Sequence, residues 1–169
     1  MTKTIAAAAA VLVLAASLSG TEPAAVDPAW AMLKTLVGDW KGTYSGAEGA
    51  GEGRLSYRLV SNGTSLMETM NSGHDEDMIT MYHPDGNRIR ATHYCAAGNQ
   101  PRMIASGLSA DGKTLAFAFV DASNVTDPDA GVMRSLTIHF QDSDHFSQDW
   151  TWREKGKDQV GTFTYTRVR

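Results

Sequence analysis

The sequence has a single cysteine, Cys95, so one chain cannot form an internal disulfide. It also lacks an excess of basic charge, because its net charge is −4 and acidic and basic residues are interspersed. Without a basic stripe or cluster, nucleic acid and anionic lipid are not expected as partners. The fold must then be held together by its hydrophobic core, even in an oxidising compartment.

Long hydrophobic runs are absent except near the start of the sequence. Lys3 precedes an apolar stretch from Ile5 to Leu18, interrupted by Ser17 and followed by small residues. About fourteen apolar residues are too few to cross a bilayer, which takes roughly 18 to 20, but they are typical of a secretory signal peptide. We therefore expect a signal peptide at 1–20, a linker at 21–27 and one mature domain at 28–169. The mature protein is expected to be periplasmic or secreted, with no membrane attachment after cleavage.

Segments long enough for crossover helices are missing as well, which excludes a parallel sheet. Asp27 and Pro28 predict the N-cap and first position of one short helix that ends near Leu36. From Gly38 onward the hydrophobic pattern has a period of two and is broken by turn residues. The predicted strands are 39–46, 52–60, 65–72, 77–83, 88–95, 101–108, 114–121, 132–140, 145–154 and 159–168.

An open sheet of about ten strands would expose two edges, and closing the sheet removes them. We therefore predict an all-β fold, a single closed antiparallel up-and-down β-barrel with a short N-terminal helix. A barrel of this size holds either packed side chains or one small ligand.

The start of the predicted barrel reads Leu36-Val37-Gly38-Asp39-Trp40. This short helix leading into Gly-x-Trp resembles the calycins, which include lipocalins, fatty-acid-binding proteins and nitrobindin-like barrels. The resemblance implies that Trp40 plugs the closed end of the barrel and that Arg167, with Arg169 as the alternative, lies over its ring. Nitrobindin-like barrels bind haem through a histidine near the start of the last strand. Residues 159–162 contain no histidine, so we expect no haem or other cofactor.

The central hairpin carries the first group of candidate site residues. A turn at 84–87 predicts Tyr82 opposite Ile89 and places Tyr82, His93 and Cys95 on one mainly apolar face. A histidine beside a thiol is one way to form a nucleophile. The alternative is a small core cysteine beside a hydrogen-bonded histidine. The segment 92–103 also resembles one found in uncharacterised secreted bacterial proteins.

Two further groups are candidates for ligand contact. Asn99, Gln100 and Arg102 follow the strand that contains His93 and could orient a ligand's carboxylate or carbonyl at the barrel mouth. Alternatively, the two amides hydrogen-bond the backbone of their own turn. Trp150 shares a face with Gln148 and Trp152, where aromatic side chains form either the core or a ligand lining. The segment 74–77 with His83 matches no metal-ligand spacing, so we expect a solvated acidic loop and no metal.

The function that these residues favour is binding of a small apolar or amphipathic molecule by an exported barrel. In this hypothesis Tyr82, His93 and Arg102 supply the polar anchors. A second hypothesis is a barrel enzyme of isomerase or hydrolase type that uses His93 with Cys95 or Tyr82. A third is a protein-interaction module with a filled barrel, since one scaffold supports unrelated functions.

Overall fold

The computed structural model describes residues 27–47, 49–71 and 78–169, which contain one short α-helix, a 3-10 helix at Ser61–Gly63 and ten strands joined by turns. Helix α1 (Pro28–Lys34) begins as predicted, since the Asp27 carboxylate accepts a hydrogen bond of 2.7 Å from the backbone nitrogen of Ala29. It ends two residues earlier than expected, because the chain tightens into a turn in which the Leu36 nitrogen donates to the carbonyl of Leu33. Within the described residues, no helix has the length and apolar character of a membrane span.

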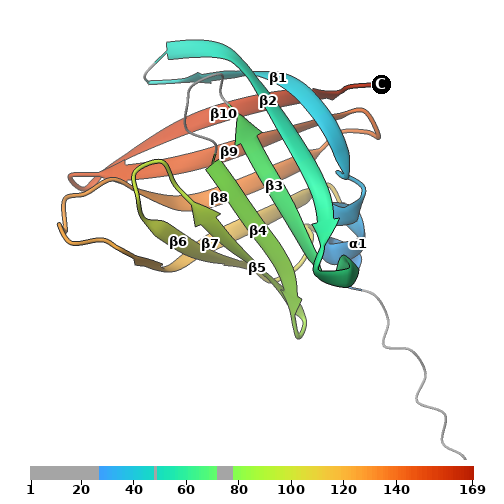
Figure 1. Cartoon of the computed structure of the whole chain (residues 1–169), viewed down its shortest axis with the longest axis horizontal. Helices are drawn as coiled ribbons and strands as arrows, with labels where there is room; N and C mark the ends of the chain where they lie inside the picture. Colours follow the sequence, from blue (N-terminus) through green and yellow to red (C-terminus); the bar gives the residue numbers. More distant parts are fainter. Residues whose placement is uncertain (1–26, 48, 72–77) are drawn as a thin grey trace, which may run out of the picture.

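The strands form one closed antiparallel barrel (Figure 1), which confirms the predicted fold class. Each strand pairs with the next along the chain, and β1 closes the barrel by pairing with β10. The strands are β1 (Gly38–Gly46), β2 (Gly49–Val60), β3 (Ser65–Asn71), β4 (Met78–Asp85), β5 (Arg88–Tyr94), β6 (Gln100–Ala105), β7 (Thr114–Ser123), β8 (Val132–Phe140), β9 (His145–Glu154) and β10 (Lys157–Arg167).

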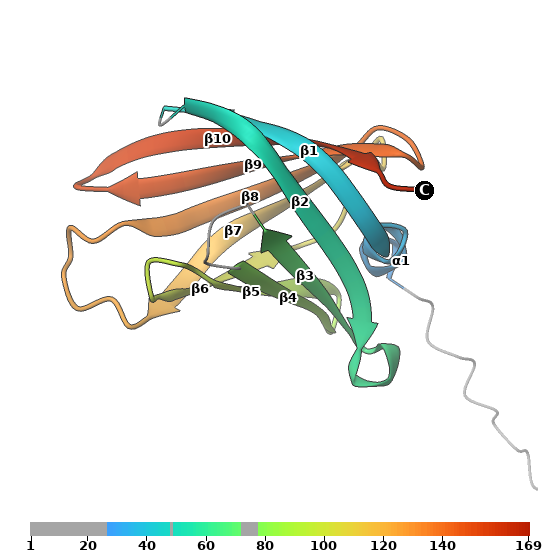
Figure 2. The ribbon, with the colours of Figure 1, turned by 45° about the horizontal axis from the view of Figure 1, so that its top comes forward.

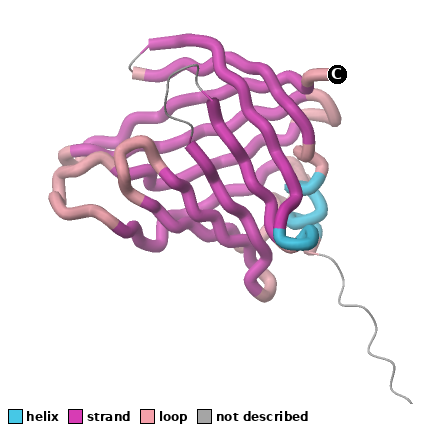
Figure 3. The backbone as a smooth tube through the Cα atoms, in the orientation of Figure 1, coloured by secondary structure: helices cyan, strands magenta, loops and turns pink. Residues whose placement is uncertain are grey.

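The connections between strands alternate between two ends of the barrel. Helix α1 lies at one end, together with the β2–β3, β4–β5, β6–β7 and β8–β9 connections, and we call this the closed end (Figure 2). The β1–β2, β5–β6, β7–β8 and β9–β10 connections lie at the other end, the open end (Figure 3). The predicted signal peptide and linker lie outside the described residues, apart from Asp27.

Apolar side chains fill the interior toward the closed end. The Trp40 ring meets Phe146 edge-on with centroids 4.6 Å apart, and Phe146 stacks on Tyr165 at 5.0 Å. All three rings are almost fully buried. Such packing is the main source of stability in a chain without disulfides.

The register of the central β4–β5 hairpin differs from the predicted register by two residues. Thr80 lies opposite His93 and Tyr82 opposite Ala91, whereas the sequence suggested Ile89 as the partner of Tyr82. The pairing continues to Asp85 and Arg88 around a two-residue turn, in which Gly86 has a φ of 64°. Because the shift is an even number of residues, each side chain keeps its predicted face. Tyr82 and His93 therefore still point inward.

Candidate functional site

Arg167 lies over the ring of Trp40 at one end of the barrel, the geometry that the sequence resemblance implied. The Arg167 guanidinium lies 4.1 Å from the centre of the Trp40 ring. It also donates hydrogen bonds to the carbonyls of Thr35, Val37 and Ser143. The indole nitrogen of Trp40 donates to the Leu36 carbonyl at 2.8 Å. Arg169, the alternative, pairs with Asp144 at the surface instead.

A polar network centred on Glu68 lies inside the barrel above the apolar layer. The Glu68 carboxylate is fully buried, and its Oε2 accepts hydrogen bonds from the hydroxyls of Tyr57 and Tyr82 at 2.5 and 2.8 Å. The side-chain amide of Gln148 donates to the same oxygen at 2.8 Å and to the Tyr57 hydroxyl at 2.9 Å. Thr80 donates to the other oxygen, Oε1, at 3.3 Å. Four donors thus converge on one buried acid.

The network forms because neighbouring strands place inward residues at the same height. Tyr57 pairs with Glu68, Glu68 with Thr80, and Thr80 with His93, so four adjacent strands contribute one row. Gln148 comes from β9 and reaches this row across the lumen. Each of the five side chains occupies an inward position of the period-two pattern.

Burial and hydrogen bonding act on the Glu68 acid in opposite directions. Burial is the larger effect and raises the pKa of Glu68 above its ordinary value, while the hydrogen bonds from Tyr57, Tyr82, Gln148 and Thr80 act to lower it. Burial and the neighbouring carboxylate raise the pKa values of Tyr57 and Tyr82 well above 10. Both tyrosines therefore remain neutral donors at physiological pH.

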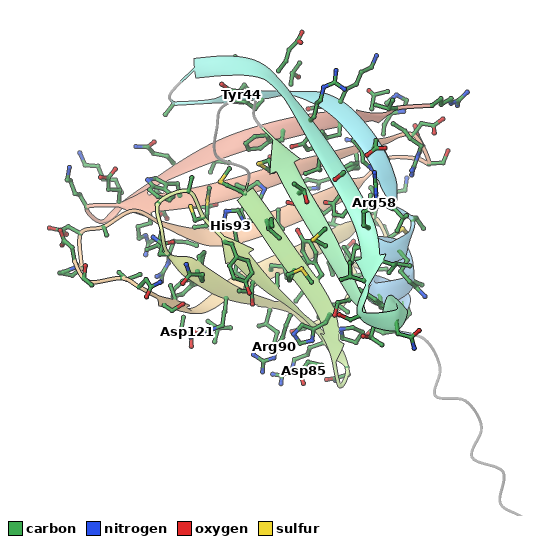
Figure 4. The ribbon with its side chains drawn as sticks, viewed as in Figure 1. Tyr44, Arg58, Asp85, Arg90, His93 and Asp121 are labelled. Atoms are coloured by element: carbon green, nitrogen blue, oxygen red, sulfur yellow. The ribbon has the colours of Figure 1, made fainter. Side chains whose placement is uncertain are left out.

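His93 extends the network toward the open end. Its Nδ1 lies 2.9 Å from the Thr80 hydroxyl, and its ring packs against Trp150 with centroids 4.8 Å apart. The side chain is 1% exposed, and its Nε2 is buried without a hydrogen-bond partner among the described residues. Burial lowers the pKa of His93 to about 4, so the imidazole is neutral at pH 7. Figure 4 shows His93 within the barrel, whereas Asp85, Arg90 and Asp121 project from its outer surface.

A cavity of about 390 Å³ opens at the open end, beyond the layer that contains His93. Its wall comes from β1, β2, β8, β9 and β10 and from the β5–β6 turn, and Trp150 links it to the network by donating to Gln148 Oε1 at 3.2 Å. The large side chains among its lining residues are Tyr44, Met133, Trp150, Trp152, Gln159 and Phe163. The cavity is therefore mainly aromatic and apolar.

Cys95 lines this cavity but does not form a nucleophilic pair with His93. Strand β5 ends at Tyr94, and Cys95 belongs to the following turn, where its backbone exchanges hydrogen bonds with Gly98 and Asn99. The thiol is half-buried, and burial raises its pKa. It is therefore protonated at neutral pH, and no hydrogen bond joins it to His93 in the described part of the chain. These features disfavour an activated cysteine.

The two amides of the β5–β6 turn bind other parts of the protein, Gln100 within its own turn and Asn99 in the neighbouring β7–β8 connection. Asn99 is buried and donates to the carbonyl of Gly131 at 2.9 Å, while Gln100 donates to the carbonyl of Gly98 and accepts from Ser123. Arg102, which we expected to anchor a ligand at the barrel mouth, does not face the lumen. Alternation along β6 turns its side chain outward, where the guanidinium is exposed and pairs with Asp121.

The most important residue that sequence reasoning missed is Glu68. The signal was present in the sequence, because Glu68 lies between Leu66 and Met70 in the period-two series that faces inward from a predicted strand. A charged residue at an inward position of a strand is rarely buried without partners. Of the predicted acidic loop, residues 74–77 lie outside the described residues, and His83 is exposed. Among the residues that are described, no group of three or more potential ligands is placed to hold a metal ion.

No model of a known protein family and no curated protein matches this sequence. The solved structures that resemble it include a protein of unknown function from the DUF3598 family of Nostoc punctiforme, with a TM-score of 0.57 and 13% identity over 80% of this chain. The matching region spans about half of that protein, 48% of its length.

Two other solved barrels give lower scores. A redesigned β-barrel has a TM-score of 0.44 and 11% identity, covering 85% of this chain and 98% of that one. The structure of EF1p2_mFAP2b bound to DFHBI has a TM-score of 0.43 and 13% identity, covering 83% and 99%. At these identities the likeness to the Nostoc protein shows a shared β-barrel fold and no more.

Proposed function

We propose that this chain is an exported, calycin-type binding protein that holds a small apolar or amphipathic molecule at the open end of its barrel. The observation that carries the proposal is the aromatic-lined cavity of about 390 Å³, set directly above a buried polar network. Export to the periplasm or the outside is inferred from the signal-like pattern of residues 1–20.

The size and chemistry of the cavity support this function. Binding pockets for small molecules usually measure roughly 300 to 1,000 Å³ and combine apolar walls with few polar groups. Here Trp150, Trp152 and Phe163 supply flat apolar surface, and the polar groups lie below them. A barrel filled along its whole length would have favoured a protein-interaction module, and an open cavity does not.

Gly161 offers a direct way to fill the cavity. Gly161 lies on β10, pairs with Trp150 of β9 and lines the cavity. A Cβ atom added to it would meet only the ring of Phe163, at an ordinary contact distance of 3.5 Å. The variant Gly161→Leu should therefore occupy the cavity without strain. Ala116→Leu is the matched control, because Ala116 is exposed on the outer face of β7.

Binding of the fluorescent apolar probe N-phenyl-1-naphthylamine tests the proposal, together with native mass spectrometry of protein purified from the periplasm. We expect saturable binding at one site, at least a tenfold weaker affinity in Gly161→Leu, and no change in Ala116→Leu. Unfolding in urea should show that Gly161→Leu changes stability by less than about 1 kcal/mol, whereas overpacking a filled core costs roughly 1 to 3 kcal/mol. Equal binding by all three proteins, or a clean apo mass with no probe binding, would contradict the proposal.

A further inference from the structure

The unpartnered Nε2 of His93 is the feature that the proposed function leaves unexplained. A buried polar atom without a partner costs free energy, so its persistence calls for a role. Whether this nitrogen accepts or donates a hydrogen bond depends on which ring nitrogen carries the proton. The position of the ring proton follows from the partner of Nδ1, which is the hydroxyl of Thr80, and that hydroxyl also contacts Glu68.

Counting protons along this chain determines the state of Nε2. Three donors converge on Glu68 Oε2, namely the hydroxyls of Tyr57 and Tyr82 and the amide of Gln148. Burial raises the pKa of Glu68, but these hydrogen bonds act in the opposite direction, and three donors on one oxygen suit the ionised carboxylate on which the inference depends. Thr80 then gives its only hydroxyl proton to Glu68 Oε1.

A threonine hydroxyl that has donated its proton can only accept from its other neighbour. His93 Nδ1, 2.9 Å away, must therefore carry the imidazole proton and donate it to Thr80. The imidazole is neutral, so Nε2 is left with a free lone pair.

We propose that Glu68 and Thr80 hold His93 in the Nδ1-protonated form, so that Nε2 is the acceptor for an O–H or N–H group of the ligand. This inference rests on the proposed function, because it identifies the polar end of the same site. The ligand class is a molecule with a flat apolar body and one neutral hydrogen-bond donor, such as a phenol or an indole.

The position of His93 next to the cavity supports this assignment. Trp150 both lines the cavity and packs against the His93 ring, and Cys95, two residues beyond His93, lines the cavity as well. His93 itself does not line the cavity, so the proposed contact requires the ligand to move the Trp150 ring that packs against it. Tyr82 cannot play this part, since its hydroxyl is already committed to Glu68.

The variant Glu68→Gln should reverse the polarity of Nε2. Tyr57, Tyr82 and Gln148 would select the amide oxygen at the Oε2 position, which leaves the NH₂ group facing Thr80. Thr80 would then accept a hydrogen bond from this NH₂ group and donate its own proton to Nδ1. The imidazole proton would move to Nε2, which becomes a donor with no change in net charge on the ring.

Nitrogen-15 NMR of the histidine side chains measures this directly and needs no ligand. We expect His93 to be protonated at Nδ1 in the wild type and at Nε2 in Glu68→Gln, with the His93 signals identified by their loss in His93→Gln. Thr80→Ser keeps the hydroxyl and should behave as wild type. In a Thr80→Val background, Glu68→Gln should no longer move the proton. The same form of His93 in wild type and Glu68→Gln, each folded by circular dichroism, would overturn the relay.

A pair of probes then tests the ligand contact. 2-Naphthol carries an O–H donor, whereas 2-methoxynaphthalene has the same rings and only an acceptor oxygen. We expect the wild type to bind 2-naphthol roughly tenfold more tightly than the ether, because the ether oxygen would face a lone pair. In Glu68→Gln the ratio should fall to about one, since an Nε2 proton can be donated to either oxygen.

The outcomes separate this inference from the proposed function. Equal affinity of the wild type for both probes, with loss of both in Gly161→Leu, would overturn the contact with Nε2 and leave cavity binding in place. Failure of the wild type to bind either probe or N-phenyl-1-naphthylamine would contradict the proposed function and the ligand contact together.

Discussion

The closed and open ends of the barrel differ in how completely the lumen is filled and how completely the buried polar atoms are hydrogen-bonded. At the closed end, Trp40 and Arg167 have their nitrogen donors paired with carbonyls, and aromatic rings fill the lumen. Toward the open end lie the cavity and the two buried side-chain polar atoms that lack a partner in the described part of the chain, His93 Nε2 and Asn99 Oδ1. The same strands thus support a packed aromatic layer at one end and, at the other, a cavity near polar atoms that lack hydrogen-bond partners.

This difference shows how a small barrel without a disulfide can keep an open cavity. The packed closed end contributes most of the stability. Unpaired polar atoms and an open cavity are therefore tolerated at the other end, where a ligand is expected. If this division is correct, equivalent substitutions at the two ends should have unequal consequences.

The largest expected effect comes from removing the Trp40 side chain at the closed end. Trp40→Ala should lower the free energy of unfolding by about 3 to 5 kcal/mol, because it leaves a cavity beneath Arg167 and Phe146. Trp152→Ala, a change of the same size at the cavity wall, should cost less than about 1.5 kcal/mol while weakening probe binding. Urea unfolding measures both. Equal costs would remove the distinction between a stabilising end and a binding end.

The next effect is the pH dependence that His93 imposes on stability. Its pKa falls from an ordinary value of 6.5 to about 4 on folding, so the folded state resists protonation. The associated stability is fully present above pH 6.5 and is lost as the pH falls from 6.5 to 4, by roughly 3 kcal/mol at about 1.4 kcal/mol per pKa unit. The groups that face the ring are Thr80 and Trp150, which are neutral, and the Glu68 carboxylate lies one hydroxyl away.

Unfolding of the wild type and of His93→Gln between pH 7.5 and 4 checks this value. The raised pKa of Glu68 acts with the opposite sign, because protonation of that acid is favoured in the folded state. Both proteins retain Glu68, so its effect largely cancels in the difference between them. Parallel curves for the two proteins would show that His93 is not protected by burial and that the open end is more accessible than the structure indicates.

A smaller effect separates the two arginines that the sequence singled out. Arg167→Met should destabilise the barrel by about 2 kcal/mol, since it removes three hydrogen bonds to carbonyls and a cation–π contact. Arg102→Met should leave stability almost unchanged, because its ion pair with Asp121 is exposed to solvent. Thermal unfolding at low and high salt compares them. An equal loss in both would mean that Arg167 acts only as a surface charge.

Much of the fold could be predicted from the sequence because its signals are local. Asp27 and Pro28 specify the start of α1, and glycine- and asparagine-containing turns mark the hairpins. Period-two patterning assigned Tyr82, His93 and Trp150 to the interior, where the structure has them. The error at the Gly86 turn did not matter for the site, since a shift of two residues preserves the face.

The candidate site could be predicted only in part because its residues meet across the lumen. Arg102 was chosen as a ligand anchor at the barrel mouth for its chemistry, although its neighbours Pro101 and Met103 are the buried residues and turn it outward. Cys95 and His93 share a predicted face, yet the strand ends between them at Tyr94. Gln100 hydrogen-bonds the backbone of its own turn, the alternative that the sequence left open, whereas Asn99 bonds the carbonyl of Gly131 in the β7–β8 connection.

The sequence by itself determined that this chain forms a ten-stranded barrel and which faces of its strands are apolar, because alternation and turn chemistry act over a few residues. Only the tertiary structure decided that Gln148 hydrogen-bonds Tyr57, 91 positions earlier, and that both meet Glu68. Periodicity assigns a side chain to the lumen but not to a height within it. That height depends on how the strands are staggered when β1 pairs with β10, which is set by closure of the whole barrel.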